Sequence, residues 1–381
     1  MKIIAGGAAT SAHEDTAGAG SRPFPARETV RCEVKTRGIR LVEKAWRVGV
    51  LTGGGDSSGI NAFLRALCVG VWKRGGEVIG IRNGWKGLVE PDLQVLTPAD
   101  VLDVTLKPGT ILGTSRTNVV KMGAVNQVVQ NIEGHGLTHL VVIGGGDTLS
   151  IAGAVADESP VPVVAVPQTI DNDIAETDVS LGFSTAVQRG IEAVSGIIPS
   201  NRAHGNPMLV EVMGRASGWL TLHIALGLEA DFVALPEFPW SVDDLVEVYE
   251  RTGPAILALI AEGVQTAELQ VTHSRFDAFG NPALEGVVHR VAARFAERAG
   301  RYPRVQVLGY VLRGGPPNSF DLNLAWRFAV GTLRALEENV TGHMVAWREG
   351  TTRLVPLGAV VGRERLVPAE LFADFRRVMV R

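Results

Sequence analysis

The feature that most constrains the fold is a regular alternation of short apolar segments with helical patterns, which begins near Trp46. Segments 48–51, 78–81, 140–143, 161–166, 208–212, 232–235, 255–260 and 305–311 have the composition of buried strands. Several of them are followed by glycine-rich turns and then by helical patterns such as 60–73 and 185–197. Because strands that alternate with helices build βαβ units, the sequence predicts an α/β protein with mainly parallel sheets.

The size and composition of the chain limit its functional class. With 381 residues, it is long enough for two domains with separate cores. A net charge of -3 gives no electrostatic indication of a nucleic-acid or anionic-membrane partner, and no apolar run has the length that crosses a bilayer. The two cysteines, Cys32 and Cys68, have neither metal nor disulfide spacing, which predicts a reducing, cytoplasmic location.

Residues 1–44 differ from the rest of the chain. They contain many small residues and little periodic apolar sequence, and they lack the apolar core of a secretory signal. The acidic Glu14, Asp15 and Glu28 argue against a targeting peptide. This segment is predicted to be a disordered extension, or the product of an upstream start codon, rather than a functional arm.

The most distinctive chemical groups follow the apolar run 161–166. The sequence P-Q-T-I-D-N-D at 167–173 places a hydroxyl and two carboxylates directly after a predicted buried strand. In open α/β sheets, ligands bind in the crevice at the carboxyl ends of the strands. One carboxylate there can accept a hydroxyl proton, and its neighbour can hold a divalent metal. This combination suits phosphoryl transfer to an alcohol.

Two glycine-rich loops predict a site for phosphate. Residues 52–61 (T-G-G-G-D-S-S-G-I-N) and 143–150 (I-G-G-G-D-T-L-S) each follow a predicted strand and open a predicted helix. Glycine lets the backbone approach a ligand, and a helix N-terminus supplies free N–H groups. The first loop matches neither the dinucleotide fingerprint nor the Walker A loop. The alternatives are a tight turn without ligand for the first loop, and a helix cap by Asp147 or Thr148 for the second.

Charged residues at other strand ends extend this pattern. The turn 109–118 (G-T-I-L-G-T-S-R-T-N) carries Arg116, which is suited to bidentate phosphate contacts. In the second half of the chain, charged residues lie at or next to the ends of three predicted strands: Arg215 in M-G-R, Glu262 in A-E-G, Arg304, and Arg313 in R-G-G. Each alone is an ordinary surface charge, but together they suit a sugar phosphate, with arginines on the phosphate and glutamate on a hydroxyl.

Taken in order, these motifs resemble the phosphofructokinase family over about residues 47–365. The order is G-G-D, G-T-x-L-G-x-x-R, G-G-[DE]-[DG]-[ST], P-x-T-I-D-N-D, M-G-R, A-E-G and R-G-G, of which T-I-D-N-D and M-G-R are the most specific. The amino-acid sequence at 109–118 and 166–173 resembles that of the branch which contains both ATP-using and pyrophosphate-using enzymes.

The resemblance implies an architecture and an assembly. It implies two Rossmann-like lobes, with donor phosphates bound by 46–182 plus about 313–362, and the sugar phosphate bound by 183–312 plus the C-terminal tail. It also implies a homodimer or homotetramer with sugar sites completed across an interface. The implied activity is that of a glycolytic 6-phosphofructokinase, which makes fructose 1,6-bisphosphate from fructose 6-phosphate with Mg²⁺ and either ATP or pyrophosphate.

The resemblance further implies roles for individual residues. Asp171 is the expected general base for the C1 hydroxyl, Thr169 orients the phosphoryl group, and Asp173 organises Mg²⁺. Sugar-phosphate binding is implied for Ile170, Asp171, Met213, Gly214, Arg215, Glu262, Arg304, Tyr310 and Arg313. Donor-phosphate binding is implied for Gly54, Gly55, Arg116, Gly145, Gly146, Asp147 and Thr148.

The chain departs from the family pattern at several of these places. Gly146 stands where the family has a metal-binding acid, and Gln168 stands where ATP enzymes usually have glycine and pyrophosphate enzymes lysine. Asn206 and Tyr310 replace an arginine and a histidine that contact the sugar phosphate, and Ser57-Ser58 replaces a pair that usually ends in proline. Two alternatives therefore stay open: a catalytically impaired binding or regulatory paralogue, and a kinase for another sugar phosphate or a nucleoside.

The phosphoryl donor depends chiefly on Asp147. In the family, glycine at this position leaves room for the α-phosphate of ATP, so that a carboxylate favours pyrophosphate. Gln168 lacks the positive charge that normally partners such an aspartate. Both donors stay open at this stage.

Overall fold

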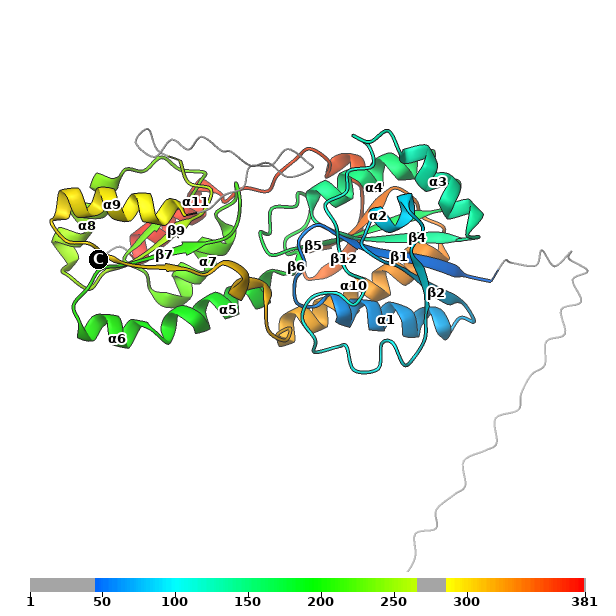
Figure 1. The fold of residues 1–381 in the computed structure, drawn as a ribbon, viewed down its shortest axis with the longest axis horizontal. Helices are drawn as coiled ribbons and strands as arrows, with labels where there is room; N and C mark the ends of the chain where they lie inside the picture. Colours follow the sequence, from blue (N-terminus) through cyan, green and yellow to red (C-terminus); the bar gives the residue numbers. More distant parts are fainter. Residues whose placement is uncertain (1–44, 266–285, 380–381) are drawn as a thin grey trace, which may run out of the picture. The chain divides into compact units, whose positions relative to one another are not determined.

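The computed structural model describes residues 45–265 and 286–379, which belong to one compact unit with two sheets (Figure 1). The extension predicted at 1–44 lies outside the described residues. Both sheets are mainly or wholly parallel, which confirms the predicted α/β class. No helix among the described residues is both long enough and apolar enough to span a membrane.

The larger sheet has the order β12-β11-β5-β4-β1-β2-β3, and the short β6 pairs with the end of β5. Its strands are β1 (Arg47–Gly53), β2 (Glu77–Ile81), β3 (Leu93–Leu96), β4 (His139–Gly144), β5 (Val163–Thr169), β6 (Leu181–Gly182), β11 (His343–Arg348) and β12 (Thr351–Pro356). The edge strands β3 and β12 are antiparallel to their neighbours. Every residue of β4 and β5 is buried, because helices cover both faces of the sheet.

Helices cover both faces of this sheet (Figure 1). On one face lie α1 (Ile60–Trp72) and α10 (Ser319–Glu337), which pack Phe63 and Phe328 into one core. On the other lie α2 (Lys86–Val89), α3 (Val125–Gly134), α4 (Gly146–Glu158) and the 3₁₀ turn η2 (Leu357–Ala359). Their buried side chains include Ile132 and Leu149.

The smaller sheet is wholly parallel, with the order β10-β7-β9-β8. Its strands are β7 (Met208–Val212), β8 (Phe232–Ala234), β9 (Leu257–Ala261) and β10 (Arg304–Val307). One core contains side chains of α5 (Phe183–Ser195), α7 (Trp219–Leu228) and α11 (Ala369–Met379), and α6 (Ile198–Ala203) follows α5. The opposite core contains side chains of α8 (Val242–Thr252) and α9 (Val287–Ala299).

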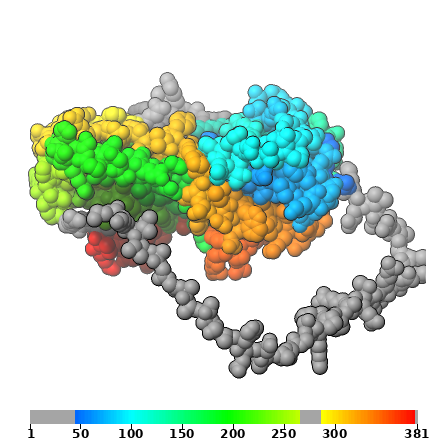
Figure 2. Space-filling view, turned by 90° about the horizontal axis from the view of Figure 1, so that it is seen from below, coloured from blue at the N-terminus to red at the C-terminus, as the bar shows by residue number. Residues whose placement is uncertain are grey.

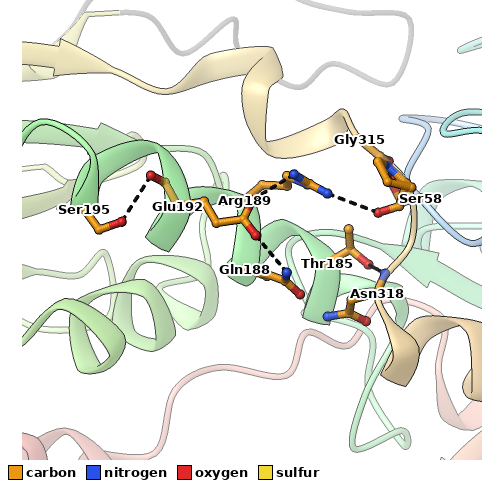
Figure 3. A network of polar contacts seen from close by, with 9 residues as sticks. Ser58, Thr185, Gln188, Arg189, Glu192, Ser195, Gly315 and Asn318 are labelled. Atoms are coloured by element: carbon orange, nitrogen blue, oxygen red, sulfur yellow. Dashed lines mark hydrogen bonds and ion pairs between the residues drawn. The ribbon is translucent and has the colours of Figure 1, made fainter. Parts of the chain in front are cut away.

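Polar contacts join the two sheets where α5 meets the segment that leads into α10 (Figure 3). The Ser58 hydroxyl donates to the Gly315 carbonyl at 2.6 Å, and the Asn318 N–H donates to Thr185 Oγ1 at 3.0 Å. The buried carboxylate of Asp321 accepts from the N–H of Thr185 at 2.7 Å. In Figure 2 the orange region of α10 borders both the blue region of α1 and the green region of α5, in agreement with the contacts of these helices.

Most predicted strands are confirmed to within a few residues, but one is wrong in its second half. The strand predicted at 305–311 ends at Val307, and the chain continues as the 3₁₀ helix η1 (Gly309–Arg313). Gly309 has a φ of 49°, which turns the chain out of the sheet after Leu308 donates a last bond to the Glu211 carbonyl. The strands β3, β11 and β12 were not predicted. In β3 and β12, exposed residues interrupt the apolar pattern, and in β11 the buried apolar run is only three residues long.

Candidate active site

The carboxyl ends of β1, β4 and β5 open onto a cavity of about 690 Å³. The end of β5, the start of α4 and the loops of the larger sheet contribute Gly54, Gly55, Arg116, Gly145, Gly146, Asp147, Thr148, Ser150, Gln168, Thr169, Asp171, Asp173 and Ile174. Loops that follow strands of the smaller sheet contribute Arg215, Ala216, Gly263, Gln265 and Arg313. A segment near the C-terminus contributes Val360, Gly362, Arg363, Glu364 and Leu366. Residues as far apart in the sequence as Gly54 and Leu366 therefore line one cavity.

Thr148 joins the two glycine-rich loops. Its side chain is buried between Gly53 and Gly144, where a Cβ would lie only 2.8 Å and 2.6 Å from Thr148 atoms. Glycine is needed at both positions to admit this threonine. The predicted alternative of a helix cap by Asp147 or Thr148 is wrong, since α4 begins after Gly145 without a side-chain cap.

The turn that carries Arg116 is fixed to the first glycine-rich loop. Thr114 Oγ1 donates to the Gly54 carbonyl at 2.7 Å, and the Gly54 N–H donates to the Ser115 carbonyl at 3.1 Å. Gly54 has a φ of 83°, a conformation that favours glycine. Arg116 therefore lines the same cavity as the backbone of both glycine-rich loops.

The side chain of Gln168 forms hydrogen bonds with the first glycine-rich loop. Its amide nitrogen donates to the Gly55 carbonyl at 3.0 Å and to Ser57 Oγ at 2.9 Å. Because a carbonyl can only accept, these contacts fix the orientation of the buried amide. The Gln168 Oε1 atom has no partner among the described residues. Gln168 is thus a neutral side chain that connects β5 to the first glycine-rich loop.

Asp171 and Asp173 lie at the tip of β5 and line the cavity. Burial raises the pKa of Asp171, and the charges of Arg313, Arg215 and Arg116 oppose that rise. Burial, together with the charge of Asp171, raises the pKa of Asp173 to about 7. Both carboxyls therefore bind protons more tightly than in water, as a group that takes up a proton near neutral pH must.

The M-G-R and A-E-G motifs form one unit. Glu262 Oε1 accepts from the N–H of Gly214 at 3.2 Å and from the N–H of Arg215 at 3.0 Å. A Cβ at Gly263 would lie 1.7 Å from the Arg215 carbonyl, so that only glycine fits there. Arg215 in turn reaches across the cavity, with Nη1 3.7 Å from Asp147 Oδ2. A residue from the smaller sheet thus pairs with the donor-side helix α4.

The raised pKa of Glu262 predicts a pH-dependent stability difference. Burial is the main cause, and it raises the pKa of this carboxyl from 4.5 to about 6. Since the folded state holds the proton more tightly, the stabilisation is complete below pH 4.5 and is lost as pH rises through 6. We expect Glu262→Gln to become more stable relative to the wild type over that range, by about 2 kcal/mol at most. Thermal unfolding at pH 4.5, 6 and 7.5 measures this; a constant difference contradicts it.

Arg313 lies between the first glycine-rich loop and the segment that carries Asp171 and Asp173. Its Nη1 donates to the Asp56 carbonyl at 2.8 Å, and a Cβ at Gly55 would lie 2.6 Å from the same nitrogen. Among the arginines that oppose the raised pKa of Asp171, Arg313 has the largest effect. The 3₁₀ turn that replaced the predicted strand end is what carries Arg313 to this place.

Some residues singled out in the sequence do not line this cavity: Ile170, Met213, Gly214, Glu262, Arg304 and Tyr310. Ile170 is fully buried in the core that also contains side chains of α5. Glu262 accepts a hydrogen bond from the backbone of Arg215 instead of lining the cavity. Arg304 is exposed on the edge strand β10, and 81% of Tyr310 is exposed. Asn206 accepts a bond from Arg301 at 2.8 Å.

A segment near the C-terminus lines the cavity, although its sequence did not predict this. Arg363 and Glu364 belong to it, in the sequence G-R-E-R-L that follows Val361. Glu364 pairs in an isolated antiparallel bridge with Ile174, which directly follows Asp173. The only signal was this run of charges after a glycine, which is common on surfaces.

The acidic residues of the cavity fit a magnesium ion of the kind that nucleotide and phosphate enzymes use. Among the described residues, no group of three or more histidine, cysteine or acidic side chains is close enough to hold a metal by itself. Mg²⁺ in phosphoryl-transfer sites is usually held by one or two carboxylates together with substrate phosphates. The half-buried Asp173 and the buried Asp171 line the cavity together with several arginines, which matches that arrangement.

Comparisons with known proteins show the family of this chain. The family model "Phosphofructokinase" matches residues 47–336. Pyrophosphate--fructose 6-phosphate 1-phosphotransferase of Amycolatopsis methanolica is 40% identical over 336 residues, which cover 86% of this chain and 98% of the relative. ATP-dependent 6-phosphofructokinase of Mycobacterium tuberculosis is 37% identical over 337 residues, with the same coverage of both chains.

Solved structures show the same fold. The phosphofructokinase of Saccharomyces cerevisiae superposes with a TM-score of 0.73 at 26% identity, over 88% of this chain and 50% of that one. A pyrophosphate-dependent phosphofructokinase of Marinobacter aquaeolei superposes with a TM-score of 0.72 over 85% of this chain and 86% of its own, at 20% identity. With the family model covering most of the described residues, the chain belongs to the phosphofructokinase family.

Proposed function

We propose that this protein is a 6-phosphofructokinase that transfers a phosphoryl group from ATP or pyrophosphate to the C1 hydroxyl of fructose 6-phosphate. The observation that carries the proposal is the pair of the buried Asp171 and the half-buried Asp173, in a cavity that Arg116, Arg215 and Arg313 also line. Relatives of nearly equal similarity are named for each of the two donors, so both stay in the proposal.

The chemistry asks the protein mainly for positioning and charge neutralisation. In this proposal the Asp171 carboxylate accepts the proton of the C1 hydroxyl. The C1 oxygen then attacks the terminal phosphorus of the donor, and the bond between that phosphorus and the bridging oxygen breaks to release ADP or phosphate. The arginines stabilise the charge that develops on the transferred group.

Asp173, with Asp171 beside it, would hold the magnesium ion together with the donor phosphates. When bound, the ion neutralises phosphate charge and orients the donor. Arg215 reaches Asp147 at 3.7 Å and so balances a carboxylate that would otherwise repel a phosphate near the start of α4.

A coupled assay with each donor tests the proposed function. Purified protein with Mg²⁺ is expected to form fructose 1,6-bisphosphate with at least one of ATP and pyrophosphate. Calorimetric binding of fructose 6-phosphate without turnover by either donor would favour the regulatory paralogue instead, which the departures at Gly146, Asn206 and Tyr310 motivate. A panel of sugar phosphates and nucleosides distinguishes a kinase with another acceptor.

Restoring an acid at Gly146 is expected to strengthen magnesium binding. A Cβ at this position meets no atom within 4 Å, and the residue opens α4, where a carboxylate also interacts well with the helix dipole. We expect Gly146→Asp to lower the Kd of Mg²⁺ in the presence of pyrophosphate by about five- to tenfold. Calorimetric titration measures the Kd, with Gly146→Asn as the uncharged control. Equal Kd values for the two variants contradict the expectation.

The edge strand β10 supports a homo-oligomer. It presents a row of exposed residues, and Tyr302, Val307, Tyr310 and Val311 are exposed around it. An exposed edge with large apolar side chains is usually covered by another chain. We propose a homodimer through this edge. Light scattering measures the molar mass of the wild type and of Val307→Lys, and the variant is expected to be the smaller of the two.

The cytoplasmic location stays a prediction from cysteine usage. Cys68 is buried and free.

A further inference from the structure

One turn separates the two carboxylates of the candidate active site, and its backbone is strained. Asn172 has a φ of 55°, in the left-handed region that non-glycine residues seldom adopt. Such a conformation persists only where the surrounding structure fixes it. The Asn172 side chain provides part of this support, since its Oδ1 accepts from the Ser180 N–H at 2.9 Å.

Arg365 provides much of the remaining support. Its backbone N–H donates to the Asp173 carbonyl at 2.7 Å, and its Nη1 donates to the Asn172 carbonyl at 3.3 Å. The third carbonyl of the turn, that of Asp171, accepts from Ser217 Oγ at 3.2 Å. One residue therefore satisfies two of the three carbonyls that determine where the carboxylates lie.

Arg365 is itself held by Trp219. The guanidinium carbon lies 3.9 Å from the centre of the indole ring, and Trp219 Nε1 donates to the Arg365 carbonyl at 2.8 Å. Trp219 is buried and opens α7, directly after the loop that carries Arg215. Two residues further on, the Val367 N–H donates to Glu237 Oε1 at 3.1 Å. The contacts thus run from the catalytic turn to the start of α7.

We propose that Arg365 is a positioning residue for Asp171 and Asp173, which fixes the turn between them and couples it to the Arg215 loop through Trp219. The proposal rests on the function proposed above for the same site. Arg365 lies beyond residues 47–336, the part of the chain that the family model matches.

The support is geometric rather than electrostatic. The arginines whose charges oppose the raised pKa of Asp171 are Arg313, Arg215 and Arg116. Burial lowers the pKa of Arg365, and the charge that opposes this is Asp178. A lysine at position 365 would keep the positive charge but lose the planar group that stacks on Trp219 and reaches the Asn172 carbonyl.

Steady-state kinetics of Arg365→Met and Arg365→Lys test the proposal. We expect kcat to fall about 10- to 100-fold in both, because a small displacement of the reacting carboxylate has effects of that size, with KM for fructose 6-phosphate changed less than about threefold. The matched control is Arg377→Met in α11, whose arginine side chain is 79% exposed. A wild-type kcat in Arg365→Met, or in Arg365→Lys alone, would overturn the geometric role.

A double-mutant cycle examines the coupling to Trp219. Trp219→Leu removes the stacking surface, and we expect the double variant with Arg365→Met to lose no more kcat than the worse single variant. Additive losses would overturn the coupling. Trp219→Phe keeps a stacking ring without the N–H and is expected to retain more activity than Trp219→Leu, which provides a conservative variant if the leucine variant is poorly folded.

Hydrogen exchange provides a readout that needs no turnover. Amides of residues 169–180 are expected to exchange faster in Arg365→Met than in the wild type or in Arg377→Met, while those of β4 stay unchanged. Unchanged exchange at 169–180 would overturn the role of Arg365. A wild-type chain without turnover would overturn the proposed function alone, and the exchange rates would still decide whether Arg365 holds the turn.

Discussion

Replacing Asp171 by asparagine is expected to reduce phosphoryl transfer by about 10²- to 10⁴-fold with either donor, the contribution typical of a general base. The amide keeps the size of the side chain but cannot take the proton of the C1 hydroxyl. Asp171 is only 7% exposed, so that no water can easily replace it. The amide can still form a hydrogen bond with the sugar, and the arginines of the cavity remain, so that the Kd of fructose 6-phosphate should change far less than kcat.

The same substitution should leave the protein at least as stable as the wild type. Burial raises the pKa of Asp171, and the ionised carboxylate at neutral pH therefore destabilises the folded state. Asparagine removes that cost, so that Tm at pH 7.5 should stay equal or rise. Unfolding monitored by circular dichroism measures Tm alongside the coupled assay.

Asp374→Asn is the matched control, because that side chain is 68% exposed on α11, outside the cavity. It is expected to keep wild-type kcat and Tm. A residual rate in Asp171→Asn within a factor of about ten of the wild type would exclude Asp171 as the base. A large fall in Tm would instead identify it as a structural residue.

The second large effect is expected on the choice of donor. Asp147→Gly removes the carboxylate that lines the cavity at the start of α4, and with it the repulsion of a further phosphate and the bulk beside Gly146. We expect the ratio of kcat/KM for ATP to that for pyrophosphate to rise about tenfold or more, which corresponds to about 1.4 kcal/mol. Initial rates with each donor at saturating fructose 6-phosphate measure the ratio.

Asp147→Asn separates charge from size in this experiment. It keeps nearly the volume of the aspartate while it removes the charge and the ion pair with Arg215, which spans 3.7 Å. If repulsion dominates, the asparagine variant should show most of the change in donor ratio. If space dominates, only the glycine variant should show it. An unchanged ratio in both variants would mean that Asp147 does not select the donor.

The sequence predicted where Asp171 and Asp173 lie, because a buried strand is a local signal. The apolar residues at 161–166 identified β5, and the polar residues after it had to lie at its carboxyl end. The glycine-rich loops were predicted for the same reason, and they line the same cavity as Asp171 and Asp173. Of the residues assigned to the sugar phosphate, only some line the cavity. Arg215 and Arg313 do, whereas Arg304 and Tyr310 do not.

The strand order was not evident from the chain. Neither the return of β11 to pair with β5 nor the turn at Gly309 can be read from periodicity, because both depend on contacts between distant segments. The 3₁₀ helix after Gly309 is the reason that Arg313 meets Asp56 instead of extending a strand. Local patterns specify elements, while their meeting points depend on packing.

The sequence by itself determined the α/β class, the family and the position of the two carboxylates, since apolar strands and glycine turns record local backbone and burial requirements. Only the tertiary structure decided which charges surround those carboxylates and what fixes the turn between them. Arg365 illustrates the difference, because it is 192 residues from Asp173 in the chain and yet donates to its carbonyl. Contacts between segments so far apart leave no periodic trace in the sequence, since they form only when both sheets have folded and packed.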